Sequence, residues 1–162
     1  MPRMGFRSAV VWITATLGLA APILGQPQIE AGLTYYRGIY FGRSPQPTFV
    51  PASQTWRRAQ EYARAFDDAW VVSGNGSSMQ PLYAEGTVLV VAVRSYDRLE
   101  SGMTAIYRNS RNRLVAHVLM AKARDGWRAG GLNNRSFDPE PVLAGNLVGV
   151  VVAAFAPAGI GS

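Results

Sequence analysis

The chain lacks cysteine and is poor in lysine and histidine. None of its 162 residues is a cysteine, so disulfides, thiolate zinc sites, iron–sulfur clusters and lipoprotein acylation are excluded. Lys122 is the single lysine and His117 the single histidine, whereas arginine stays protonated at neutral pH. The nitrogen bases open to chemistry are therefore His117, Lys122 and a free α-amine. A histidine-rich metal site is excluded, no EF-hand-like acidic loop is present, and we expect neither a metal nor a cofactor.

Charge is sparse and spread along the chain. Sixteen basic residues against ten acidic ones give a formal charge of +6, yet no basic run is longer than Arg57-Arg58. Nucleic-acid binding calls for basic residues gathered on one face beside aromatic platforms, so we expect no nucleic-acid partner. The basic balance instead favours solubility and weak attraction to an anionic membrane surface. With 48% hydrophobic residues, the chain has the composition of one folded domain.

Residues 1–25 have the pattern of a targeting segment. Arg3 and Arg7 precede an apolar stretch over residues 8–25, and no acidic residue occurs before Glu30. The stretch is borderline in length between a signal-peptide core and a membrane anchor, which needs about 20 residues. A buried core helix is the alternative, and the flanking arginines disfavour it. We expect a signal peptide or signal anchor and an extracytoplasmic protein, either anchored in the inner membrane or periplasmic or secreted.

The rest of the chain is predicted to be a proline-rich linker and one mainly β domain. Residues 26–52 read as an extended linker with one short strand around residues 33–36. Residues 53–162 are predicted to form a helix and then a β domain of about six strands. The helix, over residues 53–70, has Ser53 or Thr55 as its cap and an apolar face of Trp56, Ala59, Ala63, Phe66 and Trp70. The strands are expected at residues 70–73, 87–93, 103–108, 113–121, 127–131 and 147–155, with hairpin turns at 109–112 and 124–126.

The glycine-rich segment at residues 73–83 is the most informative stretch for chemistry. A turn of this kind after a strand can expose a serine hydroxyl beside free backbone N–H groups, as an acyl-transfer nucleophile requires. On composition alone, a Gly/Ser/Asn surface loop is the favoured interpretation. Its spacing matches neither a G-x-S-x-G elbow nor a phosphate-binding loop.

Five short motifs (boxes), in a fixed order along the chain, give this segment a family context. Ser78-Met79-x-Pro81 is followed by Glu85-Gly86-Thr87-Val88, then by Gly102-Met103-Thr104-Ala105-Ile106-Tyr107-Arg108, by Leu114-Val115-Ala116-His117, and by Gly131-Leu132-Asn133-Asn134 ending at Asp138. Over residues 70–155 this order resembles the type I signal peptidases and the related LexA-like serine peptidases. A histidine in the fourth of these segments is typical of the endoplasmic-reticulum and archaeal type, where most bacterial members have lysine.

The resemblance implies a fold, an activity and a set of site residues. It implies a LexA/signal-peptidase-like β fold and a serine endopeptidase that cleaves exported or membrane-associated polypeptides after small residues. Ser78 would be the nucleophile, His117 the general base and Asp138 the group that orients the histidine. Gly76 and Ser77 would lie at the oxyanion site, where the Ser78 N–H or the Ser77 hydroxyl donates. Further substrate-binding positions implied by the motif are Met79 and Pro81.

Strand periodicity offers a separate test of the base. On a strand over residues 113–122, side chains alternate between faces, so His117 and Lys122 reach one site only if a bulge intervenes. A lone histidine in an apolar strand is more often a buried core residue, and the boxes reverse that preference. With a histidine base, activity should rise with pH through about 6.5.

Departures from the family pattern favour a second interpretation. Leu132 replaces an aspartate, Glu85-Gly86-Thr87 replaces a Gly-Asp pair, and Met103 follows Gly102 where aspartate is usual. The alternative is therefore a non-catalytic peptide-binding module on the same fold. A self-cleaving repressor is disfavoured, because no helix-turn-helix precedes the strands and the chain starts like an exported protein.

Overall fold

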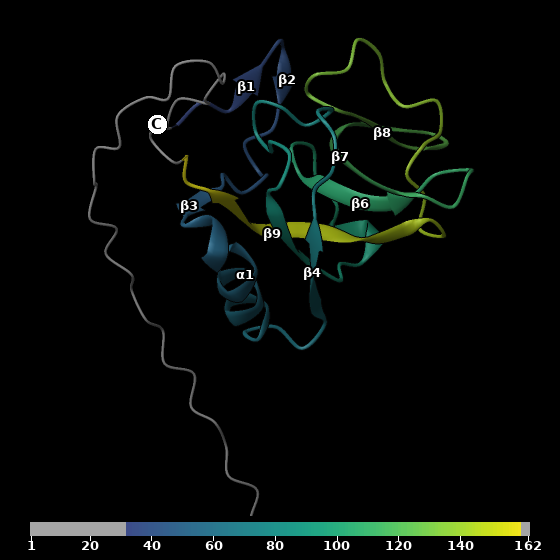
Figure 1. Ribbon diagram of the computed structural model, residues 1–162. Coiled ribbons are helices and arrows are strands. Elements are labelled where there is room, and N and C mark those ends of the chain that lie inside the picture. The colour runs from purple at the N-terminus through teal and green to yellow at the C-terminus, as the bar shows by residue number, and fades with distance from the viewer. Residues whose placement is uncertain (1–31, 160–162) are drawn as a thin grey trace, which may run out of the picture.

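A computed structural model describes residues 32–159, and over this range the protein is mainly β (Figure 1). All six predicted strands are confirmed, each end within two residues of its expected position. They are β4 (Ala69–Ser73), β5 (Val88–Ala92), β6 (Thr104–Arg108), β7 (Leu114–Ala123), β8 (Gly126–Gly130) and β9 (Leu147–Pro157). The other elements are β1 (Tyr35–Tyr36), β2 (Ile39–Tyr40), β3 (Thr48–Val50), α1 (Thr55–Ala63) and the 3₁₀ turns η1 (Ala52–Gln54) and η2 (Tyr96–Arg98).

The main sheet has seven strands in the order β4-β5-β9-β6-β7-β8, with β3 paired to the end of β9. Strand β9 crosses the middle of the molecule and pairs antiparallel with β5 and β6 (Figure 1). Both predicted hairpins are present, because β6–β7 and β7–β8 are antiparallel neighbours. Strand β4 pairs with β5 alone and forms one edge of the sheet.

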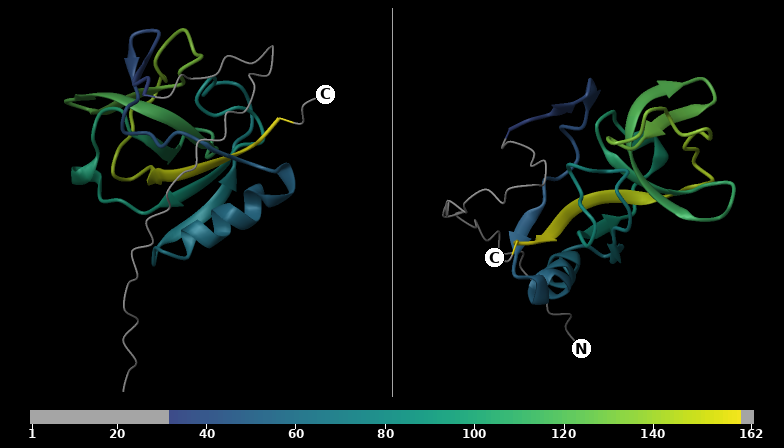
Figure 2. Two further views of the ribbon diagram at one scale, coloured as in Figure 1. Left: turned by 90° about the vertical axis from the view of Figure 1, so that its left-hand side faces the viewer. Right: turned by 45° about the horizontal axis from the view of Figure 1, so that its top comes forward.

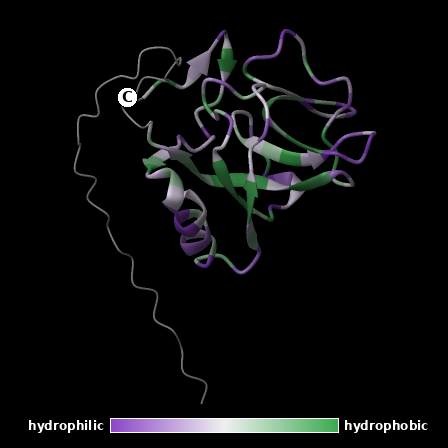
Figure 3. Ribbon diagram, in the orientation of Figure 1, coloured by the Kyte–Doolittle hydropathy of each residue, from purple (hydrophilic) through white to green (hydrophobic). Residues whose placement is uncertain are grey.

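Both faces of the sheet centre are covered. All five residues of β5 are buried, a pattern that needs apolar material on both sides of a strand. On one face, Ala59 and Ala63 of α1 pack in a cluster with Val88 and Val90 (Figure 2). On the other, the loop after β4 packs Met79, Leu82 and Tyr83 against Leu89 and Val91. The hydrophobic colour of β5 and β9 in Figure 3 marks this core.

Helix α1 is shorter than predicted and buries different residues. It ends at Ala63, since the chain must turn within residues 64–68 to enter the edge strand β4. Only Thr55, Ala59 and Ala63 of the helix are buried. The helix lies close to the sheet, and only small side chains fit between them. The predicted apolar face is wrong at Trp56 and Phe66, which are 48% and 40% exposed, while Trp70 belongs to β4. The predicted serine or threonine cap is also wrong, because Gln54 is the N-cap residue and makes no side-chain capping bond.

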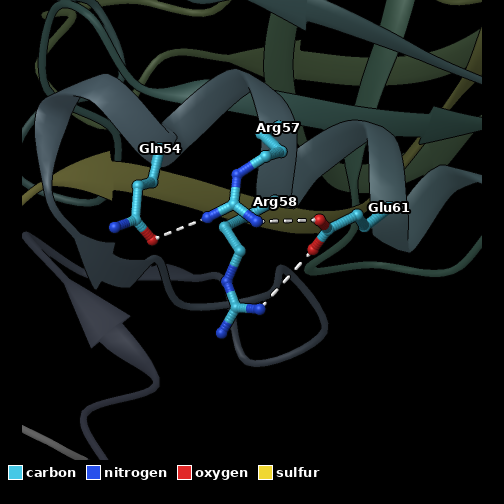
Figure 4. A network of polar contacts seen from close by, with 4 residues as sticks. All are labelled: Gln54, Arg57, Arg58 and Glu61. Atoms are coloured by element: carbon cyan, nitrogen blue, oxygen red, sulfur yellow. Dashed lines mark hydrogen bonds and ion pairs between the residues drawn. The ribbon is translucent and has the colours of Figure 1, made fainter.

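The outer face of α1 is a solvated face with ion pairs (Figure 4). Arg57 donates to Gln54 at 3.1 Å and to Glu61 at 3.2 Å, and Arg58 lies 3.5 Å from the same carboxylate. These side chains are about half exposed, so each pair contributes only about 0.3–0.5 kcal/mol to stability.

The described part of the segment over residues 26–52 is packed, which differs from the extended linker that the sequence predicts. Strands β1 and β2 form a hairpin, and β3 adds to the main sheet in parallel with β9. Phe41 is 1% exposed in the core cluster that contains Met79, and Ser44 Oγ lies 2.7 Å from Thr104 Oγ1. Residues 32–52 are therefore part of the domain.

The predicted targeting segment, residues 1–25, lies outside the described residues. Between residues 32 and 159, no helix has the length and apolar character to cross a membrane.

Two buried tyrosines predict a loss of stability at alkaline pH. Burial raises the pKa of Tyr83 and of Tyr107 far above the ordinary value of about 10. Their protons bind more tightly in the folded state, so this stability is complete below pH 10 and is lost as pH rises beyond it. We expect a lower urea midpoint at pH 11 than at pH 8. Tyr83→Phe should shrink that difference and Tyr35→Phe, at an exposed ring, should not; equal differences in the two variants would contradict the assignment.

Candidate functional site

Ser78 lies on a loop that leaves β4 and returns to β5. Two backbone bonds close the base of this loop, from Gly74 N–H to Thr87 O at 2.8 Å and from Gly86 N–H to Gly74 O at 3.2 Å. Gly76 has φ +93°, in the left-handed region that favours glycine, and a Cβ there would meet only open space. Met79 is 5% exposed and anchors the loop in the core. Ser78 is thus held between a buried anchor and an open turn.

Ser78, His117 and Asp138 come together in a hydrogen-bonded row. His117, on β7, places Nε2 3.0 Å from Ser78 Oγ and Nδ1 2.7 Å from Asp138 Oδ2. The histidine is 7% exposed. Asp138 lies in the loop between β8 and β9, where its N–H donates to Ala129 O at 2.8 Å. A proton on Nδ1 facing the carboxylate leaves Nε2 free to accept the serine proton, as in any Ser/His/Asp arrangement.

Tyr107 also contacts the row, and the sequence interpretation missed it. Its hydroxyl donates to Asp138 Oδ2, the same oxygen that faces His117. The residue was taken only as part of a strand. The available signal was chemical: a tyrosine in a strand buried on both sides needs a partner for its hydroxyl.

The loop after β8 braces the serine from a second side. Asn133 donates its N–H to Ser78 O at 2.8 Å and its side-chain amide to Ser77 O at 3.2 Å. Leu132, which departs from the motif that the sequence resembles, is fully buried in the same core cluster as Met79. This replacement therefore serves packing under the serine loop.

Gly131 gives a direct test of that bracing. A Cβ at this residue would lie 2.5 Å from Ser78 O and 3.0 Å from Ser78 Cβ, so the serine would have to move. The φ of Gly131 is outside the left-handed region, so the effect of Gly131→Ala is steric. For the serine peptidase that the sequence resemblance implies, a displacement near 1 Å at the reacting group costs about 10²-fold, so kcat/KM for peptide cleavage should fall by that factor.

Gly145→Ala is the matched control, because nothing lies within 4 Å of a Cβ there. Equal activity in the Gly131 and Gly145 variants would show that the loop does not hold the serine in place.

A cleft of about 570 Å³ opens beside Ser78 and His117. It runs between two strand edges. On one side are the end of β4 and the serine loop, and on the other is the first half of β7. β4 has a single partner strand, and β8 pairs with β7 only from Val118 onward, so residues 114–117 are bonded to β6 alone. The cleft therefore lies between two strand edges that can accept another strand.

Only two of the four residues predicted for the oxyanion and substrate-binding positions line the cleft. Gly76 and Met79 line the cleft, whereas Ser77 and Pro81 do not. Within residues 32–159, the Ser78 N–H donates to no protein acceptor, which leaves it available beside its own hydroxyl. The Ser77 side chain is exposed.

Side-chain alternation does not separate Lys122 from His117, because the bulge that was named as an exception is present. Strand β7 has a bulge between Leu119 and Ala121, which returns Lys122 to the face of Leu119 and His117. Within residues 32–159 Lys122 makes no hydrogen bond to Ser78, and its Nζ lies 5.9 Å from the centroid of the Tyr96 ring. His117 is hydrogen-bonded to Ser78, so this contact, and not the strand face, distinguishes the two candidate bases.

Comparison with models of known families, with curated proteins and with solved structures finds no match to this chain. Among the described residues, no group of three or more histidine, aspartate or glutamate side chains could hold a metal ion.

Proposed function

We propose that the protein is a serine endopeptidase with a LexA/signal-peptidase-like fold, in which Ser78 is the nucleophile, His117 the base and Asp138 the orienting carboxylate. The observation that carries the proposal is the continuous row from Ser78 Oγ to His117 and on to Asp138, with contacts of 3.0 and 2.7 Å. The open cleft at the serine end of this row supports it.

The proposed reaction follows from the atoms of that row. Ser78 Oγ attacks the scissile carbonyl carbon while His117 Nε2 takes its proton, and Asp138 stabilises the imidazolium. The Ser78 N–H is directed to the oxyanion. His117 then gives the proton to the leaving amine, and an acyl-serine remains. Water, deprotonated by the same nitrogen, hydrolyses that ester and regenerates Ser78.

The substrate best suited to the cleft is an extended polypeptide with small side chains near the cut. A peptide strand between β4 and β7 would satisfy backbone groups that the sheet leaves free on both edges. The cleft lining includes four small residues, Gly74, Gly76, Ala84 and Ala116, together with apolar side chains and the polar Asn75 and Arg113. With the targeting segment expected at residues 1–25, the proposed substrates are exported or membrane-associated polypeptides outside the cytoplasm.

Covalent labelling tests the proposal. We expect a fluorophosphonate to modify the wild-type protein at one site, located on Ser78 by peptide mass spectrometry. The departures at Glu85–Thr87 and at Leu132 motivate the second candidate, a non-catalytic peptide-binding module on the same fold. That candidate is favoured if extended peptides bind in the cleft while no adduct forms.

A further inference from the structure

The phenol of Tyr107 occupies a position that the proposed reaction does not yet use. Tyr107 is 1% exposed, and its hydroxyl donates to Asp138 Oδ2. In the β6–β7 register, Ala105 is opposite His117, so Tyr107, two residues further on, faces the same side as His117. Residues so related are diagonal neighbours across two strands. Tyr107 and His117 thus approach one carboxylate from adjacent strands.

Asp138 depends on these two partners for its orientation. Its loop, residues 131–146, is irregular apart from the bridge at Val142. The Asp138 backbone is tied by its N–H to Ala129 O, but within residues 32–159 only His117 and Tyr107 contact its carboxylate. Nearby, the carboxylate of Glu140 accepts from the Ser110 N–H at 2.9 Å and adds negative charge beside Asp138. A fixed donor on Oδ2 offsets that repulsion.

The phenol keeps its proton over the working range of such an enzyme. Burial first, and then the hydrogen bond to Asp138, raises the pKa of Tyr107 above its ordinary value. It is therefore a constant donor to the carboxylate. Tyr107 is absent from the cleft lining, so it has no contact with a bound peptide.

We propose that Tyr107 is a positioning residue, which acts through Asp138 by holding Oδ2 toward His117 Nδ1. The expected effect of Tyr107 on the reaction rate rests on the proposed function. Its effect on the orientation of Asp138 rests on the observed contacts alone. A residue of this kind alters the rate of the chemical step and leaves substrate binding unchanged.

Tyr107→Phe tests the kinetic part, because it removes the hydroxyl and keeps the buried ring. We expect kcat to fall about ten- to a hundredfold, the range for one hydrogen bond to a charged group, with KM unchanged. Tyr96→Phe is the matched control: it removes a hydroxyl that donates to Val142 O at 3.1 Å, away from the row, and it should leave both constants unchanged. A rise in KM with kcat unchanged would overturn the proposal.

Proton NMR tests the structural part without any enzyme activity. His117 is the single histidine, so its C2–H resonance in untagged protein can be followed through a pH titration without further assignment. In Tyr107→Phe we expect the titration midpoint to move to lower pH, since the imidazolium loses an oriented carboxylate. In an Asp138→Asn background, the same substitution should not move it.

Three results would overturn the inference: an unchanged midpoint in Tyr107→Phe, a midpoint at higher pH, or an equal shift in the Asp138→Asn background. The second would mean that Asp138 keeps its place and binds the imidazolium more strongly without the phenol. If the wild-type protein forms no Ser78 adduct, the proposed function fails, and the titration still decides whether Tyr107 positions Asp138.

Discussion

Replacing Ser78 with alanine should lower kcat/KM for a fluorogenic extended peptide by about 10⁵- to 10⁶-fold and abolish the fluorophosphonate adduct. The reason is that Ser78 lines the cleft and its Oγ lies 3.0 Å from His117 Nε2. Without it, only binding and the oxyanion donor remain to accelerate water attack. The peptide should carry small residues at the cut, and cleavage is measured at neutral pH.

Ser53→Ala is the control for the serine substitution. Ser53 is exposed in the short turn before α1 and has no contact with the cleft. It should keep wild-type cleavage and labelling. Undiminished turnover by Ser78→Ala would contradict the serine mechanism. An adduct that persists in this variant would show that another residue is the nucleophile.

The strands were predictable because their signal is local. Each of the six is an apolar or alternating run bounded by glycine, asparagine or aspartate turns, and the structure has all of them. Strands β1, β2 and β3 are only two or three residues long, so an alternation of apolar and polar residues cannot be recognised in their sequence. β3 forms because Thr48 lies beside Phe155, more than a hundred positions away, and no local pattern announces that pairing.

The three residues of the candidate site could be proposed from the sequence, but the residues and strand irregularities that position them could not. Ser78, His117 and Asp138 were proposed from the order of short motifs, and the fold brings them together across gaps of 39 and 21 residues. The bulge that turns Lys122 depends on the partner strand β8, and a single strand's alternation does not reveal it. Tyr107 was missed because its role depends on a loop that follows two strands later.

His117→Ala should lower kcat/KM by about 10⁴- to 10⁶-fold, because His117 is the one base hydrogen-bonded to Ser78 Oγ within residues 32–159. In the structure Nε2 is within hydrogen-bond reach of the serine, and the opposite nitrogen is held by Asp138. Asp138→Asn should lose about 10⁴-fold through the wrong imidazole tautomer, with Ser78 still in place. Both variants are measured with the same peptide substrate and with thermal unfolding as a check of the fold.

Lys122→Ala separates a histidine base from a lysine base and should keep most of the activity. Lys122 is exposed near the β7–β8 turn, and its Nζ lies over the ring of Tyr96, with no hydrogen bond to Ser78 within residues 32–159. A lysine base would have to lose its charge through burial before it could accept a proton at neutral pH. Lys122→Ala therefore tests the base assignment and serves as the matched control for His117→Ala. A dead Lys122 variant beside an active His117 variant would assign the base to the lysine, and the contact between His117 and Ser78 would then be structural.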